Sequence, residues 1–429
     1  MKQLSVSILL LLSAYTVTGQ NLQISQDSIP FYFNEIKEVT QKNFQLWDKD
    51  LYGAMLLVNP QTREIFANEP DSCGVLVKRG SIYTGILPIE INFANTAIDW
   101  NGKSWAMIIL PLPHNKQSRI NLLAHELFHK AQPSLDFTIK NADNNHLDQK
   151  DGRIYLRLEL EALKKAVTSS SKAEMEEYLT NALVFRKYRN SLYSGSDTTE
   201  NILELNEGIA EYTGQIISGR NKEQAIKNFE KSIDMFMNYP TFVRSFAYQT
   251  IPVYGFLLLE SKKDWNKEIG VKTNLVDYFI NAFNIEMPKD LKKSATNIAE
   301  KYNSKTIVTE ETAREETNKK LIAEYKFKFI EQPHLKIQFE QMNFSFDPRN
   351  IMPLENKGTV YPNIRITDKW GVLTVESGAL VSPNWQAISI SNPTNIGDKK
   401  ITGEGWELEL ADDYCLTKDE AGNYKLIKK

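Results

Sequence analysis

One stretch decides how this chain folds: Asn121-Leu122-Leu123-Ala124-His125-Glu126-Leu127-Phe128-His129-Lys130. It predicts a helix from about Gln117 to Ala131 that is apolar on nearly every side, as is typical of a buried element. His125 and His129 are four positions apart, so both imidazoles leave the same face of this helix. That spacing suits two ligands of one tetrahedral metal ion, at about 2.0–2.1 Å for each Zn–N bond. Glu126 lies about 100° further around the axis, where it can take a proton from a metal-bound water.

A His-Glu-x-x-His match can also arise by chance, and the two histidines could then be a hydrogen-bonded pair in the core. The chain has only 5 histidines among 429 residues, so such a chance match is rare. Two histidines and a glutamate on a buried helix also need partners, because unpaired buried polar groups cost several kcal/mol. Both considerations favour a metal site.

A catalytic zinc site needs a third protein ligand and keeps its fourth position for water. In metzincins a Gly and a His follow the second histidine at fixed positions, which here are Gln132 and Leu135, so that class is excluded. Asp136 is a weaker candidate because it follows Pro133, after the helix has ended. The third ligand is therefore expected further along the chain.

The better candidates are Glu207 and Glu211, which are again four positions apart on a predicted helix. Glu207 is expected to bind the metal, and Glu211 to accept the free N–H of a ligand histidine and so set its tautomer. The alternative is a solvated acidic face, because Glu200 and Glu204 fall on the same side. The need for a closed ligand set favours Glu207 as the metal ligand.

The two segments together resemble the gluzincin metallopeptidases of the peptidase MA-like group. The resemblance lies in His125-Glu126-x-x-His129 and Asn206-Glu207-Gly208-x-Ala210-x-Tyr212, and it covers about residues 80–260. It implies that Glu207 is the third ligand of a Zn²⁺ ion. It also implies hydrolysis of peptide bonds by a zinc-bound water that Glu126 activates.

Such an enzyme needs a donor that stabilises the developing oxyanion, commonly a Tyr or a His. Tyr254 is the first candidate for this role and Tyr248 the second, although either ring could instead pack in a helical core. Two further residues are candidates for contact with substrate. His146 lies in the polar segment 141–152, and Arg244 could hold a substrate carboxylate.

The whole sequence predicts an α+β protein in four parts. Residues 1–19 are typical of a secretory signal peptide, which predicts a secreted or periplasmic protein. Residues 20–110 are expected to form a mixed sheet with helices, in which Trp105–Leu110 is either an edge strand that could pair with a peptide or a buried central strand. Residues 111–330 are expected to be the mainly helical, gluzincin-like core. Residues 331–429 alternate in short strands, which predicts a β-sandwich-like domain.

The composition narrows the range of partners. The net charge is −3 and no basic patch stands out, which argues against a nucleic acid and leaves a peptide or protein as the expected substrate. No segment after residue 19 approaches 18 uncharged apolar residues, so no integral membrane segment is expected. Cys73 and Cys415 could form a disulfide in an exported protein or stay apart, and the sequence does not distinguish these cases.

Two other functions fit the same residues. A non-catalytic protein could hold zinc only structurally and use its β-domain for binding, and a fourth protein ligand such as His146 would favour it. A zinc hydrolase of non-peptide amides would share the site and differ in substrate.

Overall fold

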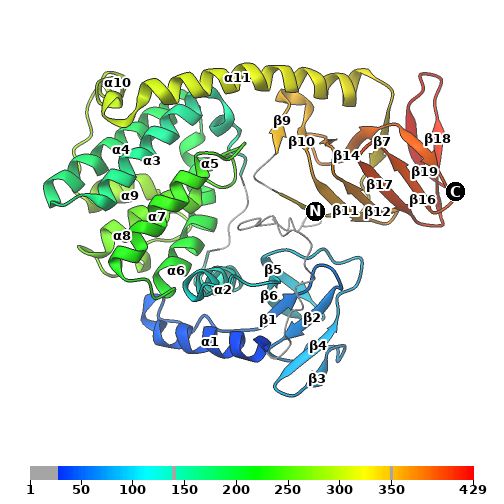
Figure 1. Ribbon diagram of the computed structural model, residues 1–429, viewed down its shortest axis with the longest axis horizontal. Helices are drawn as coiled ribbons and strands as arrows, with labels where there is room; N and C mark the ends of the chain where they lie inside the picture. Colours follow the sequence, from blue (N-terminus) through cyan, green and yellow to red (C-terminus); the bar gives the residue numbers. More distant parts are fainter. Residues whose placement is uncertain (1–27, 138–141, 348–350) are drawn as a thin grey trace.

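The computed structural model describes residues 28–137, 142–347 and 351–429. The predicted signal peptide lies outside these residues. The protein is α+β, with its helices in the central part of the chain and a strand-rich region at the C-terminal end (Figure 1). Within the described residues, no helix is long and apolar enough to cross a membrane.

The N-terminal part forms a mixed sheet with the strand order β3-β4-β2-β1-β6-β5. Neighbouring strands are antiparallel except for β1 and β6, which are parallel. The strands are β1 (Met55–Val58), β2 (Glu64–Ala67), β3 (Val77–Arg79), β4 (Ile82–Ile86), β5 (Thr96–Trp100) and β6 (Lys103–Ile109). The helix α1 (Ile29–Lys42) precedes them and packs on one face of the sheet, together with the helix that carries His125 and His129.

The strongest predicted strand is not at an edge, because β6 lies between β1 and β5. Its side chains alternate between two cores. Ala106 and Ile108 pack with the helices, whereas Trp105 and Met107 pack in a separate cluster on the opposite face. The uninterrupted apolar run therefore reflects burial on both faces, and β5 takes the edge position beside it.

The helical region begins directly after β6 with α2 (Lys116–Ala131), which carries the His-Glu-x-x-His motif. Asn115 caps this helix by accepting a hydrogen bond from the backbone N–H of Ser118 at 2.9 Å. The helices that follow are α3 (Lys150–Thr168), α4 (Lys172–Leu192), α5 (Ser196–Leu203), the π-helical segment η5 (Glu204–Gly208), α6 (Ile209–Ile217), α7 (Lys222–Phe236), α8 (Ala247–Leu259), α9 (Leu275–Ala282) and α10 (Leu291–Ala299). Their apolar faces share one core with α1 and with the inner face of the sheet.

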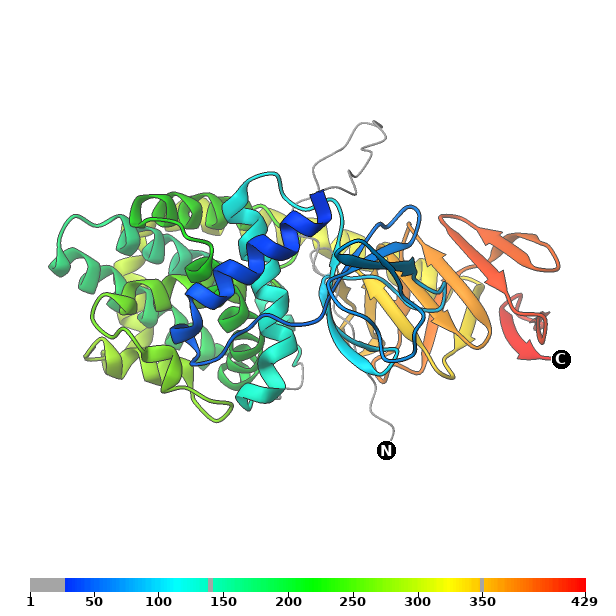
Figure 2. The same cartoon turned by 90° about the horizontal axis from the view of Figure 1, so that it is seen from below.

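The long helix α11 (Ser304–Lys326) runs from the helical region to the strand-rich region (Figures 1 and 2). Two sheets follow, with the orders β18-β19-β7-β14-β13-β10-β9 and β15-β16-β17-β12-β11-β8. Their strands are β7 (His334–Gln338), β8 (Asn343–Phe346), β9 (Met352–Pro353), β10 (Thr359–Tyr361), β11 (Ile364–Asp368), β12 (Gly371–Val375), β13 (Ala379–Val381), β14 (Ala387–Ser391), β15 (Pro393–Ile396), β16 (Lys400–Gly403), β17 (Trp406–Leu410), β18 (Tyr414–Lys418) and β19 (Tyr424–Lys428).

The two C-terminal sheets share one apolar core, which includes Ile337 and Ile388 from the first sheet and Ile366 and Leu408 from the second. This region also contacts the N-terminal part, because the Arg365 guanidinium donates to Asn92 and Thr367 donates to the Glu90 carbonyl at 3.2 Å. The disulfide that the sequence left open is not formed. Cys73 is an exposed free thiol, and Cys415 is a half-buried one on β18.

Candidate metal centre

Three side chains from two distant segments converge at the centre of the helical region. His125 and His129 come from α2 and Glu207 comes from the π-helical segment η5, and their ligand atoms all lie within 4.8 Å of one another. The two Nε2 atoms are 3.0 Å apart, and Glu207 Oε2 is 3.1 Å from His129 Nε2 and 3.6 Å from His125 Nε2. We call these three residues the His-His-Glu group.

The outer nitrogen of each imidazole already has an acceptor. His125 Nδ1 lies 3.1 Å from Glu211 Oε2, and His129 Nδ1 lies 2.8 Å from Gln132 Oε1. With Nδ1–H as the donor in each ring, both Nε2 atoms present lone pairs toward each other and toward a carboxylate oxygen. Such a buried set of acceptors repels itself unless a proton or a metal cation lies between them. Without metal a proton takes this place, because burial lowers the pKa of His125 but hydrogen bonds to Glu207 and Glu211 raise it to about 10. Two imidazoles with one carboxylate are a typical donor set for catalytic zinc.

Gln132 is a functional residue that the sequence analysis missed. Its amide Nε2 donates to the Asn206 carbonyl at 3.0 Å, which leaves Oε1 to accept from His129. Asn206 in turn donates from its side chain to Glu207 Oε1 at 3.1 Å. Gln132 therefore ties the end of the histidine helix to the segment that carries the carboxylate. The available signal was its position three residues after His129, one helical turn along the same face.

Glu126 is fully buried next to the His-His-Glu group, and neither of its carboxylate oxygens has a hydrogen-bond partner among the described residues. Burial raises the pKa of Glu126 to about 7, although the charges of His125 and His129 lower it. The acid is therefore poised to gain or lose a proton near neutral pH, which a general base requires. An unpartnered buried carboxylate also has free acceptor positions for a water molecule.

The tyrosine at this site is Tyr248 and not Tyr254, which was the first candidate. The Tyr248 ring stacks on the His125 ring with centroids 5.4 Å apart, and its hydroxyl donates to Glu207 Oε2. Burial and the Glu207 charge raise the pKa of Tyr248 well above its usual range, so it stays a protonated donor. Tyr254 is fully buried and donates to Glu159 Oε1 at 2.9 Å. Six residues of helix turn its side chain by about 240°, away from the group.

The acidic side chains along this helix do not form a solvated face, because all four are buried. Glu207 and Glu211 serve the His-His-Glu group, whereas Glu200 and Glu204 face a cluster of arginines. The π-helical segment Glu204–Gly208 spans the point where the side chains change direction, between Glu204 and Glu207. The Ile209 N–H donates to the Glu204 carbonyl five positions back, which inserts one extra residue and changes the direction of the side chains that follow.

A buried ion network joins α3, α4 and α5 to the π-helical segment that carries Glu207. Arg186 donates to both oxygens of Glu204 at 2.5 and 2.8 Å, and to Glu159 at 2.7 Å. Arg189 bridges Glu159 and Glu200 with its closest contacts at 2.7 and 2.6 Å. The network holds Glu204, and with it the start of the π-helical segment, in a fixed position.

His146 belongs to this network and not to the metal site. Its Nε2 lies 2.8 Å from Glu200 Oε1, so the structure does not bring it to the His-His-Glu group as a ligand or as a contact for substrate. The reason is that Glu200 offers a buried carboxylate directly beside the short helix Asn145–Asp148 that carries His146. Arg244 also lies outside the group, in the turn before α8, where its Nη2 is 3.6 Å from Asp143 Oδ1.

We expect Arg186→Met to destabilise the protein by about 3–5 kcal/mol, because Glu159 and Glu204 would stay buried without their shared cation. Differential scanning calorimetry of the metal-free protein measures this change as a lower unfolding temperature. In the control Lys227→Met, only an exposed ion pair with Glu223 is lost, so its unfolding temperature should hardly change. An Arg186→Met variant as stable as the wild type would contradict this account of the network.

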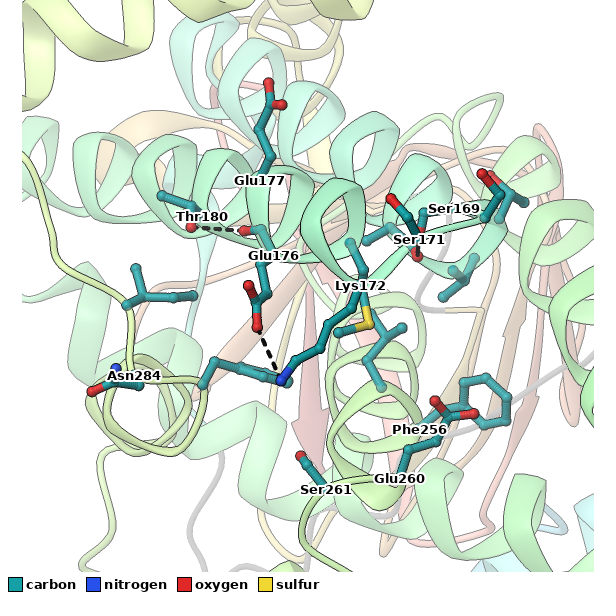
Figure 3. A pocket seen from close by; sticks show the side chains of 18 of the residues that line it. Ser169, Ser171, Lys172, Glu176, Glu177, Thr180, Phe256, Glu260, Ser261 and Asn284 are labelled. Carbon is teal, nitrogen blue, oxygen red and sulfur yellow. Dashed lines mark hydrogen bonds and ion pairs between the residues drawn. The ribbon is translucent and has the colours of Figure 1, made fainter.

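A separate cavity of about 1140 Å³ lies where the ends of α3, α4, α7, α8 and α9 meet (Figure 3). Lys172 and Glu176 form an ion pair of 3.5 Å along its wall, and Glu176 also accepts a hydrogen bond from Thr180 through its carbonyl. None of the predicted site residues lines this cavity.

Comparison of this chain with protein families, with curated proteins and with solved structures finds no match, so a function has to be inferred from the geometry of the site.

Proposed function

We propose that this protein is a secreted, gluzincin-like zinc metallopeptidase that hydrolyses peptide bonds. The observation that carries the proposal is the convergence of two Nε2 lone pairs and one carboxylate oxygen beside a buried, unpartnered Glu126. A site that only stabilised the fold would need the ligands but not this free acid. The signal-like sequence of residues 1–19 supports export.

His125, His129 and Glu207 would hold the ion. When bound there, Zn²⁺ supplies Lewis-acid polarisation of the scissile carbonyl and makes water more acidic. The hydrogen bonds that the two imidazole Nδ1–H groups donate to Glu211 and Gln132 keep both rings in the tautomer that ligation needs.

Proton transfer and stabilisation of the oxyanion are assigned to two other side chains, Glu126 and Tyr248. Glu126 takes a proton from the attacking water and passes it to the leaving amine, because its carboxylate is buried beside the ligands and has free acceptor positions. Tyr248 keeps its proton and can donate a hydrogen bond to the oxygen that becomes negative during attack. The low exposure of the site strengthens both interactions.

The proposal is tested by metal analysis together with a peptide library. We expect about one zinc ion per chain by mass spectrometry of the purified protein, and hydrolysis that is lost on removal of the ion by a chelator and restored by added zinc. Peptide cleavage that is unaffected by complete metal removal would contradict the proposal. Bound zinc without cleavage of any peptide would favour the non-catalytic alternative, and a parallel panel of non-peptide amides would identify the other hydrolase.

A further inference from the structure

A second buried polar cluster lies at the junction of the helical and strand-rich regions. The Arg244 side chain is only 10% exposed, and its Nε and Nη1 have no hydrogen-bond partner among the described residues. Its remaining nitrogen, Nη2, is 3.6 Å from Asp143 Oδ1, which is too far for a hydrogen bond. Asp143 is itself 74% exposed, so water screens this ion pair. Arg244 is thus a buried cation with most of its donors free.

Asn144 adds two more unpaired groups in the neighbouring segment of the chain. It follows Asp143 directly, is fully buried, and neither its amide nitrogen nor its amide oxygen has a partner among the described residues. Tyr361, at the end of β10, lies close enough to Arg244 and Asp143 for their charges to influence its phenol. Buried donors without partners are rare and costly, so their concentration here indicates that a ligand supplies the missing acceptors.

The backbone next to Arg244 is held in place by contacts of Thr241 and Phe242. The Asp148 carboxylate accepts from the Phe242 backbone N–H at 3.1 Å and also from the Thr241 hydroxyl. The Arg153 guanidinium lies over the Phe242 ring, 3.5 Å from its centroid. A donor on such a segment is pre-organised, which favours ligand binding because little entropy is lost.

Arg244 also lies near the catalytic tyrosine along the chain. The Phe246 N–H donates to the Phe242 carbonyl and the Thr250 N–H to the Phe246 carbonyl, so the backbone is already turned before α8 begins. Arg244 therefore lies one turn before Tyr248, about 6 Å along the axis. Since an extended peptide advances about 3.4 Å per residue, a group bound at Arg244 would be a few residues from the scissile bond.

We propose that Arg244 forms a carboxylate-binding subsite of the proposed peptidase, an inference that rests on the proposed function. A planar guanidinium with free donors matches the planar oxygens of a carboxylate, which is the anionic group that a peptide substrate offers. The carboxylate is supplied either by the free C-terminus of the peptide or by an acidic side chain.

The experiment compares matched peptides on the zinc-loaded full chain. One arm pairs peptides with a free C-terminal carboxylate against the same peptides as C-terminal amides, and the other pairs Glu against Gln near the cleaved bond. We expect the wild type to prefer one charged member about 10- to 100-fold in kcat/KM, and Arg244→Gln to lose that preference. Arg244→Lys should keep part of it, because the charge stays but the planar fork is lost.

The matched control is Arg157→Gln. Arg157 is similarly buried, at 13% exposure, but its guanidinium already pairs with Glu310 and Glu311. This variant should keep the wild-type preference for the charged peptide. Zinc content and melting temperature of each variant show whether the fold is retained.

The outcomes separate this inference from the proposed function. Cleavage of charged and neutral peptides at equal rates in both arms would overturn the subsite, as would a preference that Arg244→Gln and Arg244→Lys both retain in full. If no peptide is cleaved, titration calorimetry of the zinc-loaded Glu126→Gln variant with the same peptide pairs still tests the subsite, because it measures binding without cleavage. Tighter binding of the charged member that is lost on Arg244→Gln supports the subsite, and equal binding overturns it.

Discussion

Glu126→Gln is expected to lower kcat by about 10²–10⁴-fold while the protein still binds about one zinc ion. The substitution keeps the shape of the side chain but removes its ability to take a proton. Glu126 is not one of the three converging ligands, and its oxygens have no other partner among the described residues, so the ligand set should be undisturbed. Steady-state kinetics on a cleaved peptide and metal analysis of the same sample measure the two quantities.

The matched contrast is Glu211→Gln, the same chemical change at the acid that accepts from His125. There we expect zinc affinity to fall by about 10–100-fold, with activity recovered at saturating zinc. Added zinc would then restore the activity of Glu211→Gln but not that of Glu126→Gln, which distinguishes the roles of the two acids. Wild-type activity in Glu126→Gln would exclude it as the general base.

Tyr248→Phe is expected to lower kcat by about 10²–10³-fold with little change in KM, because the lost hydroxyl acts mainly on the charge that develops during attack. The ring itself stacks on His125 and is kept by the substitution, so the geometry of the site should persist. Stopped assays at saturating peptide measure kcat, and zinc content confirms that the ion is retained.

Tyr254→Phe is the internal control, because it lies on the same helix but donates to Glu159 in the buried ion network. This variant should melt at a lower temperature and keep its kcat close to that of the wild type. A large loss of kcat in Tyr254→Phe, together with a normal Tyr248→Phe, would reverse the assignment of the two tyrosines.

The features that the sequence predicted well are those set within one helix. The boundaries of α2 differ from the prediction by one residue, because an Asn cap at its start and a continuous apolar pattern are both local signals. The same local geometry places His125 and His129 on one face. The fold class, α+β with a strand-rich C-terminal end, also followed from periodicity along the chain.

The features that the sequence left open or placed differently all depend on what packs against a segment. Tyr254 was preferred over Tyr248 on its flanking residues, but the choice between them depends on which side of α8 faces α2 and η5. The apolar sequence of β6 fits an edge strand and a central strand equally well. It is a central strand because β5 pairs with its second side. The position of the His146 ring is set by its hydrogen bond with Glu200, which lies far away in the sequence and so could not be predicted from the segment around His146.

By itself, the sequence determined the spacing of the two histidines, the position of Glu126 beside them and the acidic stripe downstream, because helical periodicity fixes the direction of side chains a few residues apart. Only the tertiary structure decided that Glu200 and Glu204 of that stripe face Arg186 and Arg189 and not the solvent. It also decided that Gln132 and Tyr248 complete the site and that Arg244 is left with free donors. These outcomes depend on contacts between segments far apart in the chain, where burial requires each polar group to find a partner from another element.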